Sequence, residues 1–375
     1  MWHGTARRMP QGKRAMTLVE IMEKLGEPQT AALGGLAIGL IFGAAAQQSR
    51  FCLRAAIISF SRGLFDTRLA IWLLVFSGAL VATQLLYVTE TANLDEARQI
   101  ATSGSLSGAI IGGALFGIGM VLARGCASRL LVLSATGNLR ALLSGLIFAV
   151  TAQASLHGFL SPARNWLAGL WTIGPAEGLN LLASAGASHG MGALFGLVWF
   201  AAAVFFVRRN KVPAVQWMTG LAAGSAVAIA WWFTYQMSVQ SFDPVPVKSL
   251  TFTGPSADSL MMFLTPPGSM LDFDVGLVPG VFLGSFLAAY ATRELKLKGF
   301  EGGPAMRRYM LGAACMGFGG MLAGGCAVGA GVTGASIFAL TAWATLSVMW
   351  AAAAITDRLV DKPAPIHAPA PQPAE

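Results

Sequence analysis

Apolar runs of about twenty residues recur along this chain and limit what it can fold into. Residues 70–88, 191–207 and 275–291 each contain no charged side chain. A helix needs roughly 20 such residues to cross the ~30 Å hydrocarbon core of a bilayer. Only 11% of the 375 residues are charged, against about a quarter in a soluble domain. The sequence therefore predicts an all-α polytopic membrane protein whose surroundings are the lipid bilayer.

The apolar runs predict about nine transmembrane helices. Their expected ranges are 31–48, 68–88, 106–123, 141–159, 188–207, 214–235, 274–293, 308–323 and 337–356. The connections differ in charge, because the odd-numbered ones hold fifteen Lys and Arg residues and the even-numbered ones only Arg98, Arg164 and Lys248. By the positive-inside rule, the odd connections and the C-terminus are expected in the cytoplasm. Five basic residues in the N-terminal tail run against this orientation. The net charge of +8 is thus an orientation signal, and nucleic acid is not an expected partner.

An internal repeat spans the chain. Residues 112–127 and 312–327 match without a gap at nine positions, among them Cys126 and Cys326. Flanking spans also correspond, which predicts two pseudosymmetric halves, 31–160 and 188–357, joined by an external connection, 161–187. A tail, 1–30, precedes them, and a proline-rich tail, 358–375, is expected to be disordered. Halves offset by an odd number of crossings would form an inverted repeat, the usual build of a secondary transporter.

A glycine precedes each repeated cysteine, Gly125 before Cys126 and Gly325 before Cys326. Glycine-rich runs are poor helix formers, so a helix break is expected at both places. Broken helices free backbone N–H groups and present a partially positive helix N-terminus, which suits an anion. A thiol is a weak donor and a soft acceptor, so both cysteines are predicted to bind substrate and to meet near the midplane. The alternative is that a buried cysteine acts as a small hydrophobe, which is the interpretation for Cys315.

Arginines flank two cysteines: Arg124 and Arg129 bracket Cys126, and Arg50 and Arg54 bracket Cys52. Charge near a membrane interior tends to be functional, although snorkelling anchors would look the same. Arg124 is taken as a candidate substrate-binding residue. The four cysteines show neither CxxC pairing nor histidines at ligand spacing, so no metal is expected. The GxGxxG match at 329–334 follows no strand, so no nucleotide or other cofactor is expected.

Three segments, 35–65, 117–139 and 317–336, carry RFC, RGC and GGC motifs in order and resemble the YeeE/YedE sulphur-transport family of bacterial inner-membrane proteins. The resemblance implies a pseudosymmetric bundle of nine crossings with short re-entrant helices. It further implies uptake of thiosulfate or a related small sulfur anion, with Cys52, Cys126 and Cys326 relaying the ion, and a cytoplasmic sulfur-carrier protein as a partner. Aligning 39–52 with 192–206 puts Phe205 opposite Cys52, so that cysteine lacks a mate in the second half.

Two other functions fit the same residues. A membrane sensor would bind a sulfur compound and signal without carrying it, and a membrane sulfurtransferase would hold sulfur as a persulfide on a low-pKa cysteine. A selenium-related substrate also fits the resemblance. Transport without enzymatic activity is the favoured function, because the repeat and the embedded cysteines both serve it directly.

Overall fold

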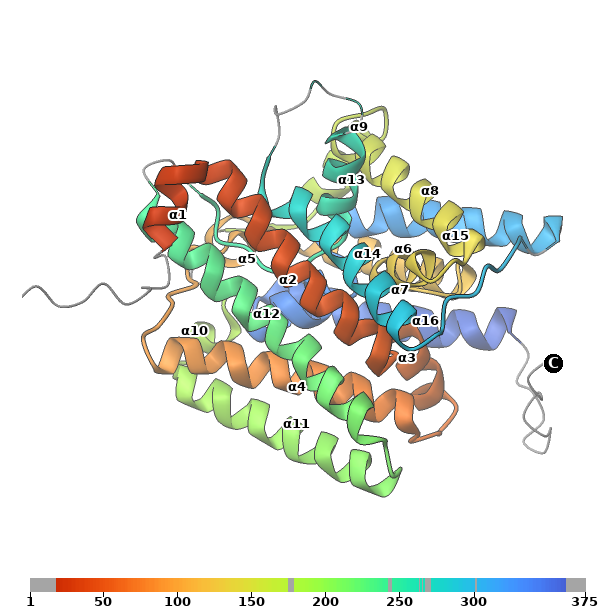
Figure 1. Cartoon of the computed structure of the whole chain (residues 1–375), viewed down its shortest axis with the longest axis horizontal. Coiled ribbons are helices and arrows are strands. Elements are labelled where there is room, and N and C mark those ends of the chain that lie inside the picture. Colours follow the sequence, from red (N-terminus) through yellow and green to blue (C-terminus); the bar gives the residue numbers. More distant parts are fainter. Residues whose placement is uncertain are drawn as a thin grey trace, which may run out of the picture.

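The computed structural model describes residues 18–361, except 175–178, 242–244, 263, 265, 267–270 and 301. The predicted disorder of the proline-rich tail falls on 362–375, outside the described residues. Figure 1 shows long helices lying side by side in a bundle, with short helices and turns between them. The prediction of an all-α polytopic membrane protein is confirmed.

The helices and strands follow one another in this order: α1 (Leu18–Leu25), α2 (Glu27–Ser49), α3 (Leu53–Ser61), α4 (Thr67–Val88), α5 (Arg98–Ala101), β1 (Gly104–Ser105), α6 (Leu106–Leu122), α7 (Ala127–Ala135), α8 (Leu139–Leu156), α9 (Ser161–Gly169), β2 (Thr172–Ile173), α10 (Leu181–Ser184), α11 (His189–Arg209), α12 (Ala214–Gln240), α13 (Thr253–Met262), α14 (Phe273–Ala291), α15 (Gly303–Leu322), the π-helix η1 (Gly329–Gly334) and α16 (Leu340–Val360). Side-chain caps fix several starts. The Asp66 carboxylate accepts from the N–H groups of Arg68 and Leu69 before α4, which satisfies donors that no helical carbonyl can reach.

Seven described segments are long and apolar enough to cross a membrane: Glu27–Ser61, Thr67–Val88, Leu106–Ala135, Leu139–Leu156, His189–Arg209, Ala214–Gln240 and Phe273–Ala291. The first joins α2 to α3 and the third joins α6 to α7. Helices α15 and α16 have 20 and 21 residues, enough for a crossing, but are not among the seven. Arg307 and Arg308 lower the hydropathy of α15. Nine crossings therefore remain a prediction.

The two repeat helices, α6 and α15, cross in close contact. A Cβ at Gly112 would lie 2.5 Å from the Gly319 carbonyl oxygen, and one at Gly312 would lie 2.7 Å from the Gly119 carbonyl oxygen. The repeat relates Gly112 to Gly312 and Gly119 to Gly319. The two contacts are therefore equivalent under the repeat. Because residues early in one helix meet residues late in the other, α6 and α15 run antiparallel. Small residues permit such backbone contact between membrane helices.

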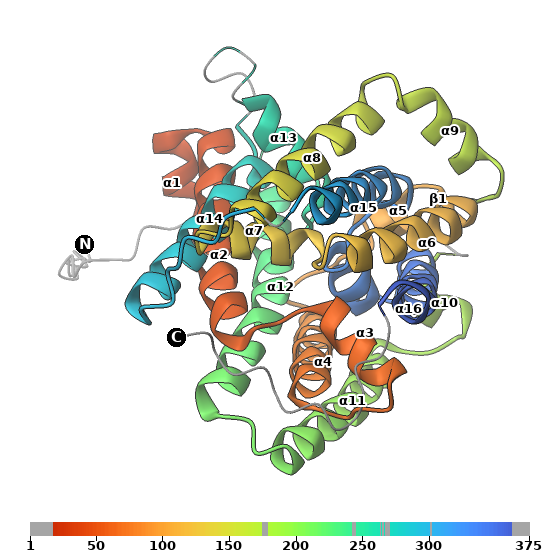
Figure 2. The same ribbon diagram turned by 90° about the vertical axis from the view of Figure 1, so that its right-hand side faces the viewer.

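Helices α2 and α14 also pack closely (Figure 2), but they run parallel, because residues early in one meet residues early in the other. A Cβ at Gly35 would meet the Phe273 carbonyl, and one at Gly43 would meet the Val281 carbonyl. From α14, a Cβ at Gly280 would lie 2.4 Å from the Leu36 carbonyl. Glycine at four-residue spacing on both helices leaves no room for any side chain along this seam, which makes it rigid.

The same packing pairs recur in the two halves. Contacts between the halves come in matching pairs: α2 packs on α14 as α12 packs on α4, and α6 packs on α16 as α15 packs on α8. Within the halves, α3 packs on α4 as α13 packs on α14. Helix α11 stands outside the pattern and packs on α4 (Figure 1). The alignment of residues 39–52 with 192–206 is therefore wrong, since it places α11 opposite α2. The packing instead places α12 opposite α2, and short α13 opposite short α3.

A small antiparallel ribbon joins two long connections. Gly104 and Ser105 of β1 pair with Ile173 and Thr172 of β2. The Ser105 hydroxyl also donates to the Ala168 carbonyl at 2.7 Å. These bonds hold the segment before α6 against the segment after α9, so the short α5 and α9 come to the same end of the bundle.

Candidate functional site

Three long helices end at a residue with positive φ placed two positions before a cysteine or its repeat equivalent. Arg50 (φ 55°) precedes Cys52, Arg124 (φ 56°) precedes Cys126, and Gly324 (φ 74°) precedes Cys326. The chain then turns into a short helical segment: Cys52 and Cys126 are the N-caps of α3 and α7, and η1 follows Cys326. The helix breaks predicted at Cys126 and Cys326 are therefore present, and a third lies at Cys52.

The two repeat turns have the same hydrogen bonds. Gly125 N–H donates to the Met120 carbonyl at 3.1 Å, and Gly325 N–H donates to the Gly320 carbonyl at 2.9 Å. This bond closes a helix over a left-handed residue, a position that glycine normally fills. Arg124 occupies it in the first turn although a side chain there is strained. Glu90, Lys211 and Arg293 take the same conformation at the ends of other helices.

Cys126 is fully buried and its thiol has two polar neighbours. It lies next to the Cys52 thiol, and its sulfur lies 3.5 Å from the Ser128 hydroxyl. The guanidinium groups of Arg54 and Arg129 lie close enough to Cys52 to act on it electrostatically. The structure thus brings Cys52 and Cys126 together as a thiol pair beside positive charge.

Cys326 has a different set of neighbours. Its sulfur accepts hydrogen bonds from the backbone N–H groups of Phe252 at 3.3 Å and Gly329 at 3.4 Å. The Thr251 hydroxyl lies 4.0 Å away. Because two N–H donors occupy the sulfur lone pairs, the S–H proton remains to be donated to an acceptor. Cys326 is therefore arranged as a hydrogen-bond donor.

The two repeat cysteines do not touch each other in the described structure. Each follows the end of its helix, and because α6 and α15 run antiparallel, Cys126 and Cys326 lie on opposite sides of the crossing. The thiol that reaches Cys126 is that of Cys52. Cys315 lies within α15, and no hydrogen bond links it to these three among the described residues.

Arginines line a cavity of about 520 Å³ beside Cys52 and Cys126. This Arg54 cavity is bounded by Arg54, Ala55, Ile58, Arg62, Arg68, Arg124, Asp357, Val360 and Asp361. Some of its charge is neutralised by the end of α16. Asp361 pairs with Arg54 at 3.5 Å and with Arg308 at 3.0 Å. Arg124 also lies over the Tyr309 ring, with its Cζ atom 5.8 Å from the centroid.

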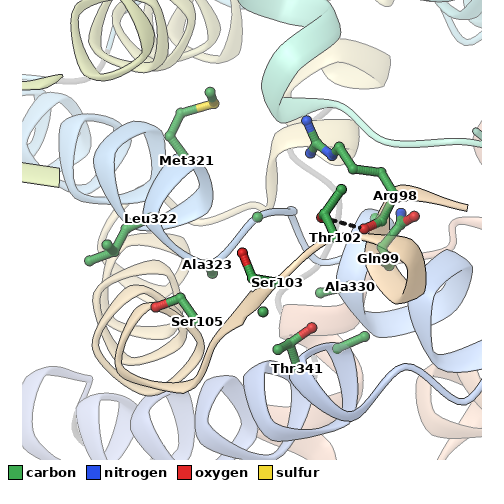
Figure 3. A pocket seen from close by; sticks show the side chains of 14 residues that line it. Arg98, Gln99, Thr102, Ser103, Ser105, Met321, Leu322, Ala323, Ala330 and Thr341 are labelled. Carbon is green, nitrogen blue, oxygen red and sulfur yellow. Dashed lines mark hydrogen bonds between the residues drawn. The ribbon is translucent and has the colours of Figure 1, made fainter. Parts of the chain in front are cut away.

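A second cavity, of about 350 Å³, lies at the opposite end of the bundle, beside Cys326. This Lys248 cavity is lined by charged residues (Arg98, Arg164, Lys248, Asp258 and Asp274), by Thr251 and by the glycines at 324, 325 and 329. A neighbouring space of about 200 Å³ shares Arg98, Gln99 and Met321 with it. Figure 3 shows this space, with Arg98 and Gln99 on one side, Met321 and Leu322 on the other, and Thr341 below.

Thr251 and Phe252 are site residues that the sequence reasoning missed. A signal for them exists, because the offset of 200 that relates Cys126 to Cys326 also relates Ser49 to Ser249 and Cys52 to Phe252. Phe252 thus supplies a backbone N–H where the first half supplies a thiol. Among the described residues, no group of three or more His, Cys, Asp or Glu residues could hold a metal ion.

Comparison with known families decides between the possible kinds of membrane protein. The sequence profile of the family described as Sulphur transport matches residues 48–355, most of the chain. The protein belongs to the Sulphur transport family. That range contains all three motif cysteines, the Lys248 cavity and the part of the Arg54 cavity that precedes Asp357. The resemblance to the YeeE/YedE family is therefore confirmed.

Two relatives have an assigned activity. The thiosulfate transporter TsuA of Spirochaeta thermophila is 26% identical over 321 residues, covering 82% of this chain and 93% of that protein. The thiosulfate transporter TsuA of Escherichia coli K12 is 26% identical over 351 residues, covering 84% and 91%. Both alignments extend over nearly the whole length of the relatives, so the similarity is not confined to one segment.

Proposed function

We propose that this protein carries thiosulfate across the bacterial inner membrane into the cytoplasm. The observation that carries the proposal is the placement of thiols at helix breaks between two charged cavities, in a chain whose relatives are thiosulfate transporters. The positive-inside count supports an orientation in which the Lys248 cavity opens outward and the Arg54 cavity faces the cytoplasm, together with the C-terminus. The reciprocal glycine contacts of α6 and α15 support two halves arranged as an inverted repeat.

The anion would meet the thiols in turn. Entering from the Lys248 cavity, it reaches Thr251 and the S–H of Cys326, whose backbone partners keep the proton directed at an incoming acceptor. It then passes to the Cys126–Cys52 pair and leaves past Arg124 and the Arg54 cavity. Weak successive contacts allow passage without trapping. The polarizable terminal sulfur of thiosulfate suits a thiol donor better than the hard oxygens of sulfate do.

Gly125 and Gly325 contribute to the anion path because they lack a side chain. They lie in the tight turns that expose backbone beside the cysteines, and a Cβ at Gly325 would lie 3.0 Å from the Ala330 N atom. Arg124 would hold the departing anion at the inner mouth. A cytoplasmic sulfur-carrier protein would then receive the sulfur there, at the arginine-lined surface.

Uptake of radiolabelled thiosulfate into proteoliposomes tests the function. The expected result is uptake by the wild type that is abolished in Cys126→Ala and Cys326→Ala and strongly reduced in Cys52→Ala. Cys315→Ala is the matched control and is expected to behave as wild type, because that thiol has no partner among the three. Binding without uptake would show a sensor instead, and a stable sulfur adduct of ~32 Da on a cysteine would show a sulfurtransferase. Uptake that survives both repeat variants would rule out the thiol path.

A further inference from the structure

Arg98 and Arg164 come from connections distant in sequence and meet at one cavity. Arg98 begins α5 and Arg164 lies on α9, and the pairing of β1 with β2 brings these two segments together. Both side chains line the Lys248 cavity. Together with Lys248 they are the three basic residues of the even-numbered connections. All the Lys and Arg residues of the even-numbered connections therefore line the Lys248 cavity.

The charges of these three residues are not equally available. The Lys248 ammonium pairs with the Asp274 carboxylate at 2.9 Å and with Asp272, so its charge is neutralised. Within the described residues, no carboxylate forms an ion pair with Arg98 or Arg164. The Arg164 guanidinium donates to the neutral Asn165 side chain at 2.8 Å, and its Nε has no hydrogen-bond partner.

The two guanidinium groups also repel each other. Burial, followed by the nearby charge of Arg98, lowers the pKa of Arg164. The Asp274 carboxylate acts electrostatically on Arg98 but is already paired with Lys248. Two adjacent guanidinium groups that share no carboxylate of their own are stabilised when an anion joins them. Guanidinium groups present paired N–H donors whose spacing matches the oxygens of an oxyanion. The cavity that both arginines line, of about 350 Å³, is large enough for a small ion of this kind.

We propose that Arg98 and Arg164 together form an entry site for a small dianionic oxyanion, placed ahead of Cys326 on the transport path. The proposal rests on the proposed function, which gives the direction of transport. It extends that function by dividing the selection of the anion into two steps. The arginine site recognises two negative charges on a small oxyanion and does not distinguish thiosulfate from sulfate. The thiols beyond it, which favour a soft sulfur atom, make that distinction.

This division has a kinetic consequence. Sulfate should occupy the arginine site and compete with thiosulfate without being carried. In proteoliposomes, sulfate is then expected to raise the apparent KM of wild-type thiosulfate uptake and leave the maximal rate unchanged. In Arg98→Gln and Arg164→Gln, the KM is expected to rise about tenfold, the effect of losing one charge-assisted contact, and sulfate inhibition is expected to weaken by a similar factor.

The lysine variants Arg98→Lys and Arg164→Lys keep the charge but lose the paired donors, so an intermediate KM is expected. Arg208→Gln is the matched control, since Arg208 lies near the end of α11, away from both cavities, and its KM should equal that of the wild type. A wild-type KM with unaltered sulfate inhibition in both glutamine variants would overturn the proposal.

Sulfate binding to the purified protein separates this proposal from the proposed function. Isothermal titration of the wild type with sulfate is expected to show saturable binding, and the double variant Arg98→Gln/Arg164→Gln is expected to lose it. If the wild type fails to import thiosulfate yet binds sulfate through these arginines, the proposed function fails and the entry site stands. If the double variant, folded by size-exclusion chromatography, binds sulfate as the wild type does, the entry site fails.

Discussion

The thiols of Cys52 and Cys126 lie next to each other, although the two residues belong to different helix breaks and 74 positions separate them. Neither is in a disulfide. Adjacent thiols are oxidised readily to a disulfide when an oxidant reaches them. Diamide, which takes up the two electrons and two protons that the thiols lose, is expected to join Cys52 to Cys126 and to stop thiosulfate uptake until dithiothreitol restores it.

Mass spectrometry of the tryptic peptides checks the crosslink, and uptake checks its effect. Cys52→Ala is expected to remove the diamide-induced disulfide, while Cys315→Ala is expected to leave it unchanged because that thiol has no cysteine partner. A disulfide that instead contained Cys326 would contradict the arrangement in which Cys126 and Cys326 lie on opposite sides of the α6–α15 crossing.

The contact between α6 and α15 leads to a prediction about stability. A Cβ at Gly112 would lie 2.5 Å from the Ala323 backbone nitrogen, and neither helix can withdraw without opening the crossing. Gly112→Ala is therefore expected to destabilise the protein by about 1–3 kcal/mol, the usual cost of overpacking. Thermal unfolding in detergent, followed by tryptophan fluorescence, measures the change.

Gly145→Ala on α8 is the control for that substitution, since a Cβ there meets nothing within 4 Å. Alanine has a higher helix propensity than glycine, so this variant is expected to unfold at the wild-type temperature or above it. Gly312→Ala should behave as Gly112→Ala does, because its Cβ would lie 2.6 Å from the Ala123 nitrogen. Equal tolerance of all three substitutions would contradict close backbone contact at the crossing.

Much of this architecture could be predicted from the sequence, because membrane helices are specified by local composition. Apolar runs set the rough ends of the spans, and the glycine–cysteine repeat located two of the three helix breaks. The predicted bounds of the two halves, 31–160 and 188–357, remain predictions, although α2 begins at Glu27 and α16 continues to Val360.

The partners of the cysteines could not be predicted, because they depend on packing between segments far apart in the chain. The repeat suggested that Cys126 would meet Cys326, whereas the antiparallel crossing of α6 and α15 separates them and brings Cys52 to Cys126. Similarly, Phe252 donates its backbone N–H to Cys326. Every residue except proline has such a donor, so the residue type at position 252 does not reveal it. The alignment of residues 39–52 with 192–206 is wrong for a similar reason. The composition of α11 resembles that of other apolar helices, and only packing shows that α11 lies outside the repeat.

An ion pair at the C-terminal end of α16 gives a third prediction. The Asp357 side chain is 1% exposed and accepts two hydrogen bonds from Arg62, at 2.9 and 3.0 Å. Arg62→Gln leaves a buried carboxylate without its cation, which is expected to cost about 2–3 kcal/mol, less than for a fully buried pair because Arg62 is 31% exposed. Adding Asp357→Asn should restore part of the loss.

Thermal unfolding of the two single variants and the double variant measures the coupling. The exposed pair of Arg50 with Glu294, at 3.3 Å and with Arg50 66% exposed, is the control. Arg50→Gln is expected to cost no more than about 1 kcal/mol, since solvent screens exposed pairs. Equal costs at the two sites would show that the Arg62–Asp357 pair is solvated and does not fix the end of α16.

The Lys248 cavity also contains a carboxyl group that titrates in an accessible range. Burial, followed by the charge of Asp274, raises the pKa of Asp258 to about 6. Asp272 raises it further, while Lys248 and His157 lower it. Below pH 6 the Asp258 side chain is therefore neutral, and above pH 6 it carries a negative charge inside the cavity that receives the anion. Thiosulfate itself remains a dianion throughout, because its conjugate acid is strong.

The KM of thiosulfate uptake is accordingly expected to be lower at about pH 5 than at about pH 7.5, by roughly threefold to tenfold. Equal pH on both sides of the liposome membrane removes any contribution of a proton gradient. Asp258→Asn is neutral at both pH values, so its KM should stay low and independent of pH. A pH dependence that persists in Asp258→Asn would place the titrating group elsewhere, whereas its loss in that variant alone assigns to Asp258 the control of anion entry beside Lys248.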